Sequence, residues 1–400
     1  MDGALQEYLR ARLTRETLED LLRRGGREDA AVAELTVSPL TAAGENFGSV
    51  MAAVEARLRG GDPVRAVAKL LPMAPFLRDS FDCEVTVRKE VAFYRRLAPE
   101  LRRLRPDLDL FPACLGARTG DGDLVDESAV ILLEDLKARG FQTRQRLRGL
   151  DLAHAELALT GLGRLHALCV AVKRLRPAVF QDIVTHVAAP FHLGPRGEDD
   201  VLLGVDRAVS VLGDIPACAP HTARVRESLR RVLRDIAPPA PREPFSAIVH
   251  NDFWTNNMMF RPGAHGRPEE VKIVDFQITL HDSPLKDVLL FLHTSLEVGL
   301  RENSQDHLLG VYHHAFTDTL ASVGVDAADF SLQALRQELD AVAPGCFAHI
   351  FFLHRVIFAE GRPDMATFSI KDFVDSSRLG ELYRVRVGQL VGEFVRRGWI

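Results

Sequence analysis

The alternation of apolar and polar residues divides the chain into a β-rich part and a helical part. The first 34 residues are rich in charge and predict one or two short helices. Three short runs of β-branched and apolar residues follow at 35–40, 49–58 and 65–71, with glycine-rich turns between them. Runs of this length with short connections predict an antiparallel meander.

One helix and two further strands are predicted before residue 136. Residues 82–97 place four apolar side chains on one helical face, with charged residues between them: Val87, Val91, Tyr94 and Leu97. Two strand-like runs follow at 111–118 and 129–133, and the second of them stops at an acidic pair.

The helical period dominates beyond residue 136. It is clear at 152–172, 197–235 and 284–320. The exception is 247–275, where short apolar strands surround polar turns, just after a proline-rich link at 238–244.

These patterns together predict an α+β fold with two lobes. One is a small antiparallel β-rich N-lobe, and the other is a large, mainly helical C-lobe. We expect a helical extension at 1–34, the N-lobe at 35–135 and the C-lobe at 136–400.

The composition narrows the class of protein only slightly. A chain of 400 residues predicts two to three domains at about 150 residues each. Its 50 basic and 55 acidic residues give a net charge of −5, which is ordinary for a globular protein. This mild acidity argues against a nucleic-acid coat or a membrane-surface protein, so we expect neither as a partner.

The cysteines and the longest uncharged run predict the cellular location. Five cysteines lie far apart, which fits neither a disulfide framework nor a zinc knuckle and indicates reduced thiols. The N-terminus carries charge from its second residue and lacks the apolar core of a signal peptide. The longest uncharged run, 341–354, is too short to span a membrane. We therefore expect a soluble, cytoplasmic protein.

Polar side chains suited to phosphate chemistry end two of the short strands in 247–275. Asp252 and Asn257 follow one run, and Asp275 ends the next. In phosphoryl transfer, one carboxylate orients and deprotonates the attacking hydroxyl, while an amide oxygen and a second carboxylate hold magnesium on the nucleotide. The alternative is that Asp252 and Asn257 only cap a turn, which their residue types also favour.

The spacing of these residues also resembles a known group of enzymes. The pattern H-x-D-x-x-x-x-N, formed by His250, Asp252 and Asn257, precedes an apolar residue, Asp275 and Phe276. This arrangement resembles the catalytic and metal loops of the aminoglycoside phosphotransferase and choline kinase group. The resemblance implies that group's bilobal protein-kinase-like fold.

Further phrases narrow the resemblance to the ecdysteroid-kinase-like (CHK-kinase-like) family of small-molecule kinases. They are Trp254, the pair Asn256-Asn257, and the runs VDFQ, ILLEDL and GENFGSVM, which occur in the family's order. One position departs, because Asn251 stands where the group usually has glycine. Asparagine adopts a positive φ more readily than most other residues.

The resemblance implies a catalytic loop at 247–260 and a metal loop at 271–277. Asp252 would be the catalytic base, and Asn257 and Asp275 would hold Mg²⁺. His250 and Asp287 would support the catalytic loop structurally, with Asp287 near the start of a helix.

The N-lobe would then bind ATP. The backbone of the glycine-rich segment, which includes Gly44, Asn46, Gly48 and Ser49, would cover the phosphates. Lys69 would contact phosphate oxygens, steadied by Glu90 on the following helix, with Glu84 as the competing partner. Backbone groups from Glu134 to Leu136 would contact the adenine at the hinge between the lobes.

The predicted function is an ATP-dependent kinase, a phosphotransferase with an alcohol group as acceptor. The resemblance implies a lipophilic acceptor, either ecdysteroid-like or xenobiotic. With 4 Tyr and 2 Trp against 22 Phe, an aromatic cage for choline is less expected. A cluster in the C-lobe forms either core or an apolar acceptor pocket: Phe347, Phe351 and Phe352.

Two alternatives remain at the level of sequence. One is a metal-dependent phosphoesterase built from His250, Asp252, Asp275 and His281. The other is a catalytically silent nucleotide-binding module of the same fold. The phosphoesterase does not explain Lys69, Glu90 or the hinge-like strand. A silent module would normally have lost one of the three polar loop residues, and all three are present.

Overall fold

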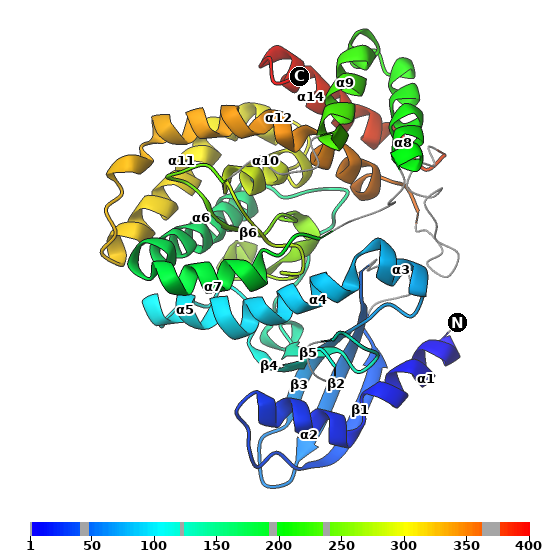
Figure 1. Ribbon diagram of the computed structural model, residues 1–400, viewed down its shortest axis with the longest axis vertical. Helices are drawn as coiled ribbons and strands as arrows, with labels where there is room; N and C mark the ends of the chain where they lie inside the picture. Colours follow the sequence, from blue (N-terminus) through cyan, green and yellow to red (C-terminus); the bar gives the residue numbers. More distant parts are fainter. Residues whose placement is uncertain (1, 41–47, 121–123, 192–197, 235–240, 362–376) are drawn as a thin grey trace.

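The N-lobe is built on a five-stranded antiparallel sheet (Figure 1). The computed structural model describes all residues except 1, 41–47, 121–123, 192–197, 235–240 and 362–376. The strand order is β1-β2-β3-β5-β4, so the expected meander and the two later strands are all present. The strands are β1 (Val32–Pro39), β2 (Val50–Leu58), β3 (Val64–Leu70), β4 (Cys114–Arg118) and β5 (Val130–Glu134).

Two N-terminal helices cover one face of this sheet. Helix α1 (Asp2–Arg12), helix α2 (Arg15–Arg24) and the link between them share an apolar cluster with the strands, to which this segment contributes Tyr8, Leu9, Leu13, Leu18, Leu21 and Leu22. The hydroxyl of Tyr8 donates to the backbone oxygen of Leu71 at 2.8 Å. The N-terminal segment is therefore packed onto the sheet, and burial of its leucines stabilises the lobe.

The other helices of the N-lobe lie between the sheet and the C-lobe (Figure 1). They are α3 (Pro75–Ser80), α4 (Cys83–Ala92), the π-helical turn η1 (Phe93–Leu97) and α5 (Ala98–Leu104). Residues 82–97 thus form the expected helix, with a π-helical turn in its second half. Phe93, Leu97 and Leu101 pack in the same core cluster as the C-lobe, so this row of helices joins the two lobes.

The C-lobe is mainly helical. Its helices are α6 (Leu152–Leu175), α7 (Pro177–Val187), α8 (Glu198–Ser210), α9 (Thr222–Arg234), α10 (Leu285–Thr294), α11 (Leu300–Ser322), α12 (Leu332–Ile357) and α14 (Glu381–Arg396). The 3₁₀ turns are η2 (Lys137–Arg139), η3 (Val211–Asp214), η4 (Ala219–His221), η5 (Thr255–Asn257), η6 (Ala264–Gly266) and η7 (Ala328–Phe330). The ranges 197–235 and 284–320 each contain two helices, because prolines interrupt the first range and Gly299, at φ +83°, interrupts the second.

Two short antiparallel pairs form the expected β insert within the helical lobe. Strand β6 (Ala247–Val249) pairs with β9 (Leu280–Asp282), and β7 (Met258–Pro262) pairs with β8 (Pro268–Ile273). The strand β9 was not predicted, because three residues carry too little pattern to separate them from a loop. The α+β, two-lobed fold class predicted from the sequence is confirmed.

Helix α6 is the central helix of the C-lobe. In the described part of the chain it alone is long and apolar enough to cross a membrane, yet 78% of its most apolar window is buried inside the protein. A β-carbon on Gly163 would lie 2.8 Å from the backbone oxygen of Tyr312, so α6 and α11 approach closely. Its apolar character is therefore that of a core helix.

The contact between α2 and β4 provides a test of the packing in the N-lobe. A β-carbon on Gly116 would lie 1.9 Å from the backbone oxygen of Leu21, so Gly116→Ala forces two backbones apart. We expect it to lower the free energy of unfolding by about 2 kcal/mol or more in urea denaturation. The matched control is Gly310→Ala in α11, where no atom lies within 4 Å and alanine should add about 0.5–1 kcal/mol. Equal stabilities of the two variants would contradict the close packing.

Candidate active site

A buried carboxylate fixes the loop that follows β6. Asp287, in the first turn of α10, accepts the backbone N–H of His250 at 2.6 Å and that of Asn251 at 2.7 Å. Asn251 has φ +64°, which is the left-handed conformation that asparagine tolerates. Asn251 is therefore accommodated at the position of the usual glycine, and the loop places Asp252 close enough to Asp275 for their charges to interact.

Histidines support this loop rather than acting at its tip. The Nε2–H of His250 donates to the backbone oxygen of Val274 at 3.0 Å, and its Nδ1 accepts the N–H of Asp252 at 3.2 Å. These partners fix a neutral ring, and burial lowers the pKa of His250 accordingly. His166, buried in α6, bonds to both Asp287 and the hydroxyl of Tyr312.

The charge on Asp287 is stabilised by the same contacts. Burial alone would raise the pKa of this carboxyl, but the hydrogen bond from His166 and the backbone donors outweigh it and hold the pKa below its usual value. Asp287 therefore remains a carboxylate that accepts three hydrogen bonds inside the protein.

Asp252 and Asn257 lie in direct contact. The amide nitrogen of Asn257 donates to both the carboxylate and the backbone oxygen of Asp252, at 2.8 Å each. These bonds orient the side chain so that its oxygen, the atom suited to a metal ion, takes no part in them. The backbone of Asn257 also accepts the N–H of Val274 at 3.0 Å, which ties this loop to the one that carries Asp275.

A buried lysine connects the two lobes. Lys69 on β3 donates to Glu90 on α4 at 2.6 Å and to Asp275 of the C-lobe at 2.7 Å. Glu84, the competing partner considered from the sequence, pairs with Arg88 instead. Burial disfavours the charge on Lys69, but the carboxylates of Asp275 and Glu90 outweigh it and raise the lysine's pKa.

Three carboxyl groups lie around the single ammonium group of Lys69: Glu90 and Asp275 contact it, and Asp252 interacts with Asp275. Burial and then the carboxylate of Asp275 raise the pKa of Asp252 to about 7. The oxygens of Asn257 and Asp275 are hard donors of the kind that magnesium prefers, with nucleotide phosphates supplying further ligands. The residues present therefore fit a divalent cation that binds together with a nucleotide.

The four-residue metal cluster of the phosphoesterase alternative is not assembled. His281 lies on β9 and bonds to the hydroxyl of Ser246 at 3.2 Å, and His250 is engaged with Val274. Within the described residues, no group of three or more His, Cys, Asp or Glu side chains is placed to hold a metal ion.

Stacked aromatic rings join the metal loop to the helix that carries Glu90. Phe276, directly after Asp275, lies parallel to Phe93 with ring centroids 3.6 Å apart, and its ring lies 5.0 Å from that of His250. Sequence reasoning did not find this contact. The available signal was that Phe93 lies one helical turn after Glu90 and that an aromatic residue follows Asp275 directly.

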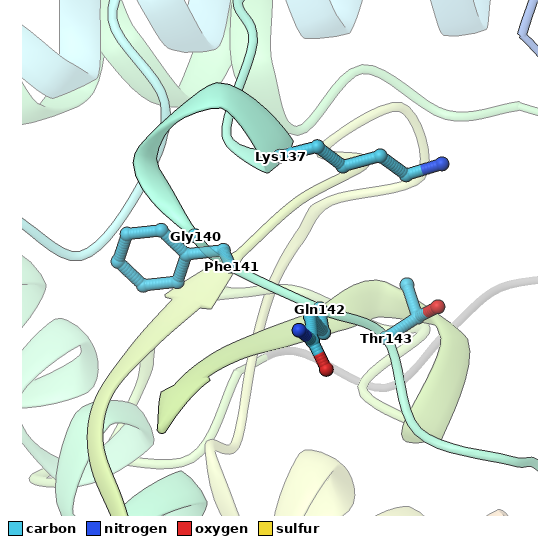
Figure 2. Close-up of a pocket in the computed structure, with 5 residues that line it drawn as sticks. All are labelled: Lys137, Gly140, Phe141, Gln142 and Thr143. Carbon is cyan, nitrogen blue, oxygen red and sulfur yellow. The ribbon is translucent and has the colours of Figure 1, made fainter. Parts of the chain in front are cut away.

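The predicted hinge is apolar around Leu136 and has charged residues at its edge. Leu136 is buried with Phe141, Met259 and Val274 in a small apolar cluster. A cavity of about 290 Å³ opens beside it, lined by Lys137, Gly140, Phe141, Gln142 and Thr143 (Figure 2).

The backbone hydrogen bonds of the hinge reduce the number of N–H groups that could make the predicted adenine contact. The N–H of Glu134 donates to Ala113 and that of Asp135 to Arg65, whereas the N–H of Leu136 has no partner in the described part of the chain. The side chain of Glu134 braces the hinge through Arg139 and the N–H of Ala113. Of the three predicted hinge residues, Leu136 is therefore the one whose backbone N–H lacks a partner among the described residues, and its contact with adenine stays a prediction.

The glycine-rich segment is described only at its end. Gly44 and Asn46 lie outside the described residues. A β-carbon on Gly48 would lie 3.1 Å from the side-chain nitrogen of Gln277, two residues after Asp275. Gly48, and Ser49 next to it, therefore lie near the metal loop, where their backbone could reach phosphate groups.

The sequence as a whole matches a known family. The model of the ecdysteroid kinase-like family matches residues 43–325. The chain belongs to this family. The ecdysteroid kinase-like family is one of small-molecule kinases, so the chain is a kinase-type phosphotransferase by descent. No curated protein matches the sequence.

Several solved structures of kinases resemble the ecdysteroid kinase-like chain at low identity. An ethanolamine kinase from Plasmodium vivax is 11% identical, with 100% of this chain and 97% of that chain covered and a TM-score of 0.46. A choline/ethanolamine kinase family protein from Mesorhizobium loti is 14% identical, with coverage of 90% and 92% and a TM-score of 0.38. An amicoumacin kinase in complex with AMP-PNP and Ca²⁺ is 14% identical, with coverage of 97% and 96% and a TM-score of 0.41. All three likenesses are distant.

The buried carboxylate of Asp287 gives a direct test of the loop's support. In Asp287→Ala, the N–H groups of His250 and Asn251 lose their acceptor inside the protein. We expect the free energy of unfolding to fall by about 2–4 kcal/mol in urea denaturation. Asp329→Ala is the matched control, because its carboxylate is exposed and pairs with Arg174 at the surface, and it should change stability by less than about 0.5 kcal/mol. Equal effects of the two variants would show that Asp287 does not hold the loop.

Proposed function

We propose that this member of the ecdysteroid kinase-like family transfers the γ-phosphate of ATP, with Mg²⁺, to a hydroxyl group of a small molecule. The observation that carries the proposal is the position of Lys69, which bonds to Glu90 in one lobe and Asp275 in the other. A buried ammonium between two carboxylates, next to an acid and an amide in contact, is the arrangement that phosphoryl transfer requires.

Each residue then has a defined part in the reaction. Asp252 accepts the proton of the acceptor hydroxyl as its oxygen forms a bond to the γ-phosphorus, while the bond from that phosphorus to ADP breaks. Asn257 orients Asp252 through its amide nitrogen. Lys69 holds phosphate oxygens in line for the transfer. Asn257 and Asp275 would hold Mg²⁺, which would supply positive charge beside the nucleotide's phosphates.

The family's name supports a lipophilic, ecdysteroid-like alcohol as the acceptor, and a xenobiotic alcohol is the second candidate. The phenylalanines considered for an apolar pocket do not form one on their own, because Phe347 and Phe351 are fully buried in the core. These two rings therefore belong to the core.

Replacement of the base tests the chemistry. We expect Asp252→Asn to lower the turnover of ATP-dependent phosphorylation by about 10²–10⁴-fold, because the hydroxyl loses its proton acceptor. ATP affinity, measured by thermal shift, should stay close to that of the wild type. Asp306→Asn, an exposed position on α11, is the control and should leave both quantities unchanged. Unchanged turnover in Asp252→Asn would refute the assignment.

Replacement of the carboxylate on the metal loop tests the cation site. Asp275→Asn removes the negative charge from residue 275. We therefore expect Mg²⁺ to give no additional thermal stabilisation to the ATP complex of this variant. Stabilisation by ATP in the presence of EDTA should persist in both the wild type and the variant. An undiminished effect of Mg²⁺ in the variant would place the cation at another position.

A further inference from the structure

Helix α4 carries a second buried charged residue directly before Glu90. The side chain of Lys89 is fully buried, at 0% exposure. Successive residues of an α-helix point about 100° apart, so Lys89 and Glu90 leave the helix on different faces. Glu90 bonds to Lys69 in the candidate site, whereas Lys89 bonds to the C-lobe. The proposed reaction gives Lys89 no part.

The contact of Lys89 lies at the end of α7. Its Nζ donates to the backbone oxygen of Ala189 at 2.8 Å and lies 4.0 Å from the centroid of the Phe191 ring. Both partners belong to the segment that follows α7 directly. Carbonyl groups at the end of a helix carry the negative end of its dipole, and the face of an aromatic ring attracts a cation. A lysine nitrogen therefore suits this position, where it joins α4 to α7 (Figure 1).

The same end of α7 is bonded to the chain that follows the metal loop. The hydroxyl of Thr279 donates to the backbone oxygen of Val187 at 2.6 Å, and the Thr279 side chain is buried. Thr279 lies four residues after Asp275. The end of α7 therefore contacts the elements that carry both carboxylate partners of Lys69: the helix of Glu90 and the chain of Asp275.

The ends of α4 give this helix little support of their own. At its start, Asp82 has φ +44°, a left-handed conformation, and its side chain does not cap the helix. At its other end, α4 continues into the π-helical turn Phe93–Leu97, and such turns are rare and occur mostly at functional sites. The position of Glu90 therefore depends on contacts along the sides of α4, and the bond from Lys89 is a buried contact of this kind.

The charge of Lys89 is costly to the fold. Burial lowers the pKa of Lys89 to about 7, although the carboxylate of Asp82 opposes this shift. The folded protein thus binds this proton less tightly than the unfolded chain does, so the charge lowers stability, most fully below pH 7. A methionine of similar length would avoid this cost. Stability alone therefore does not explain the lysine, whereas its bond to α7 gives it a purpose.

We propose that Lys89 is a positioning residue of the nucleotide site, because it fixes α4 to the end of α7 and thereby holds Glu90 against Lys69 while ATP binds. A displacement of α4 by about 1 Å would disturb the contact between Glu90 and Lys69, and a displacement of that size can cost about 10²-fold in activity. This inference rests on the proposed kinase function and adds a contact between the lobes that sets its nucleotide affinity.

The test measures Mg·ATP binding to the full-length chain by isothermal titration calorimetry at about pH 6, where Lys89 carries its charge. Lys89→Met keeps the length of the side chain and removes the donor. We expect this variant to bind Mg·ATP at least about 5-fold more weakly than the wild type. Its melting temperature without nucleotide should equal or exceed that of the wild type, because the buried charge is gone.

The matched control is Arg96→Met. Arg96 also joins this row of helices to α7, but through an exposed ion pair with Asp182. Such pairs contribute little, so the control should bind Mg·ATP as the wild type does.

A double-mutant cycle assigns the effect to Glu90. In the Glu90→Gln background, we expect Lys89→Met to weaken Mg·ATP binding by less than about twofold, because the contact that Lys89 holds in place is already lost. Full addition of the two single effects would mean that Lys89 does not act through Glu90, and it would overturn the inference.

The other failures are also distinguishable. Mg·ATP affinity of Lys89→Met within twofold of the wild type would overturn the role of Lys89 while the kinase function stands. Weaker binding together with a melting temperature several degrees below that of the wild type would overturn it too, since that result indicates a general loss of structure. An equal loss of affinity in Arg96→Met would do the same. A wild type that does not bind Mg·ATP would overturn the proposed function and this inference with it.

Discussion

The ion pairs of the Lys69 ammonium group are the contacts on which the rest of the candidate site depends. The ammonium group is almost fully buried, and it bonds at once to Glu90 of the N-lobe and Asp275 of the C-lobe. Removal of a charge from water is costly, and the loss of one partner would leave an unpaired charge inside the protein. The two lobes must therefore be placed so that β3, α4 and the metal loop meet at one point.

Two further sets of contacts hold the metal loop and the catalytic loop in place. The ring of Phe276 stacks on Phe93, which aligns the metal loop with the helix of Glu90. Asp287 holds the catalytic loop through two backbone donors, and His250 connects that loop to Val274. These contacts fix the positions of Asp252, the proposed base, and of Asn257 and Asp275, the proposed cation ligands, and such preorganisation is what electrostatic catalysis requires.

The sequence predicted the parts of this arrangement that leave a local pattern. The meander, the amphipathic helix of Glu90 and the strand ends at Asp252 and Asp275 follow from periodicity and polar residues after apolar runs. Asn251, which stands at the position of the family's glycine, has a positive φ of the kind that asparagine tolerates.

The remaining features depend on residues that are distant in the chain. Neither the stack of Phe93 on Phe276 nor the bond from Lys89 to Ala189 has a local signal, because each joins segments that only the tertiary fold brings together. Nor does the sequence show that Lys69 also reaches Asp275, since a strand lysine in isolation reads as a solvated edge residue.

The central claim is that the Lys69 ammonium lies where the phosphates of a nucleotide bind. The most direct measurement uses an acyl-phosphate derivative of ATP, which transfers its acyl group to an amine at that position, with peptide mass spectrometry to locate the label. We expect acylation of Lys69 that excess Mg·ATP suppresses. Labelling confined to other lysines, or labelling of Lys69 that ATP does not suppress, would contradict it.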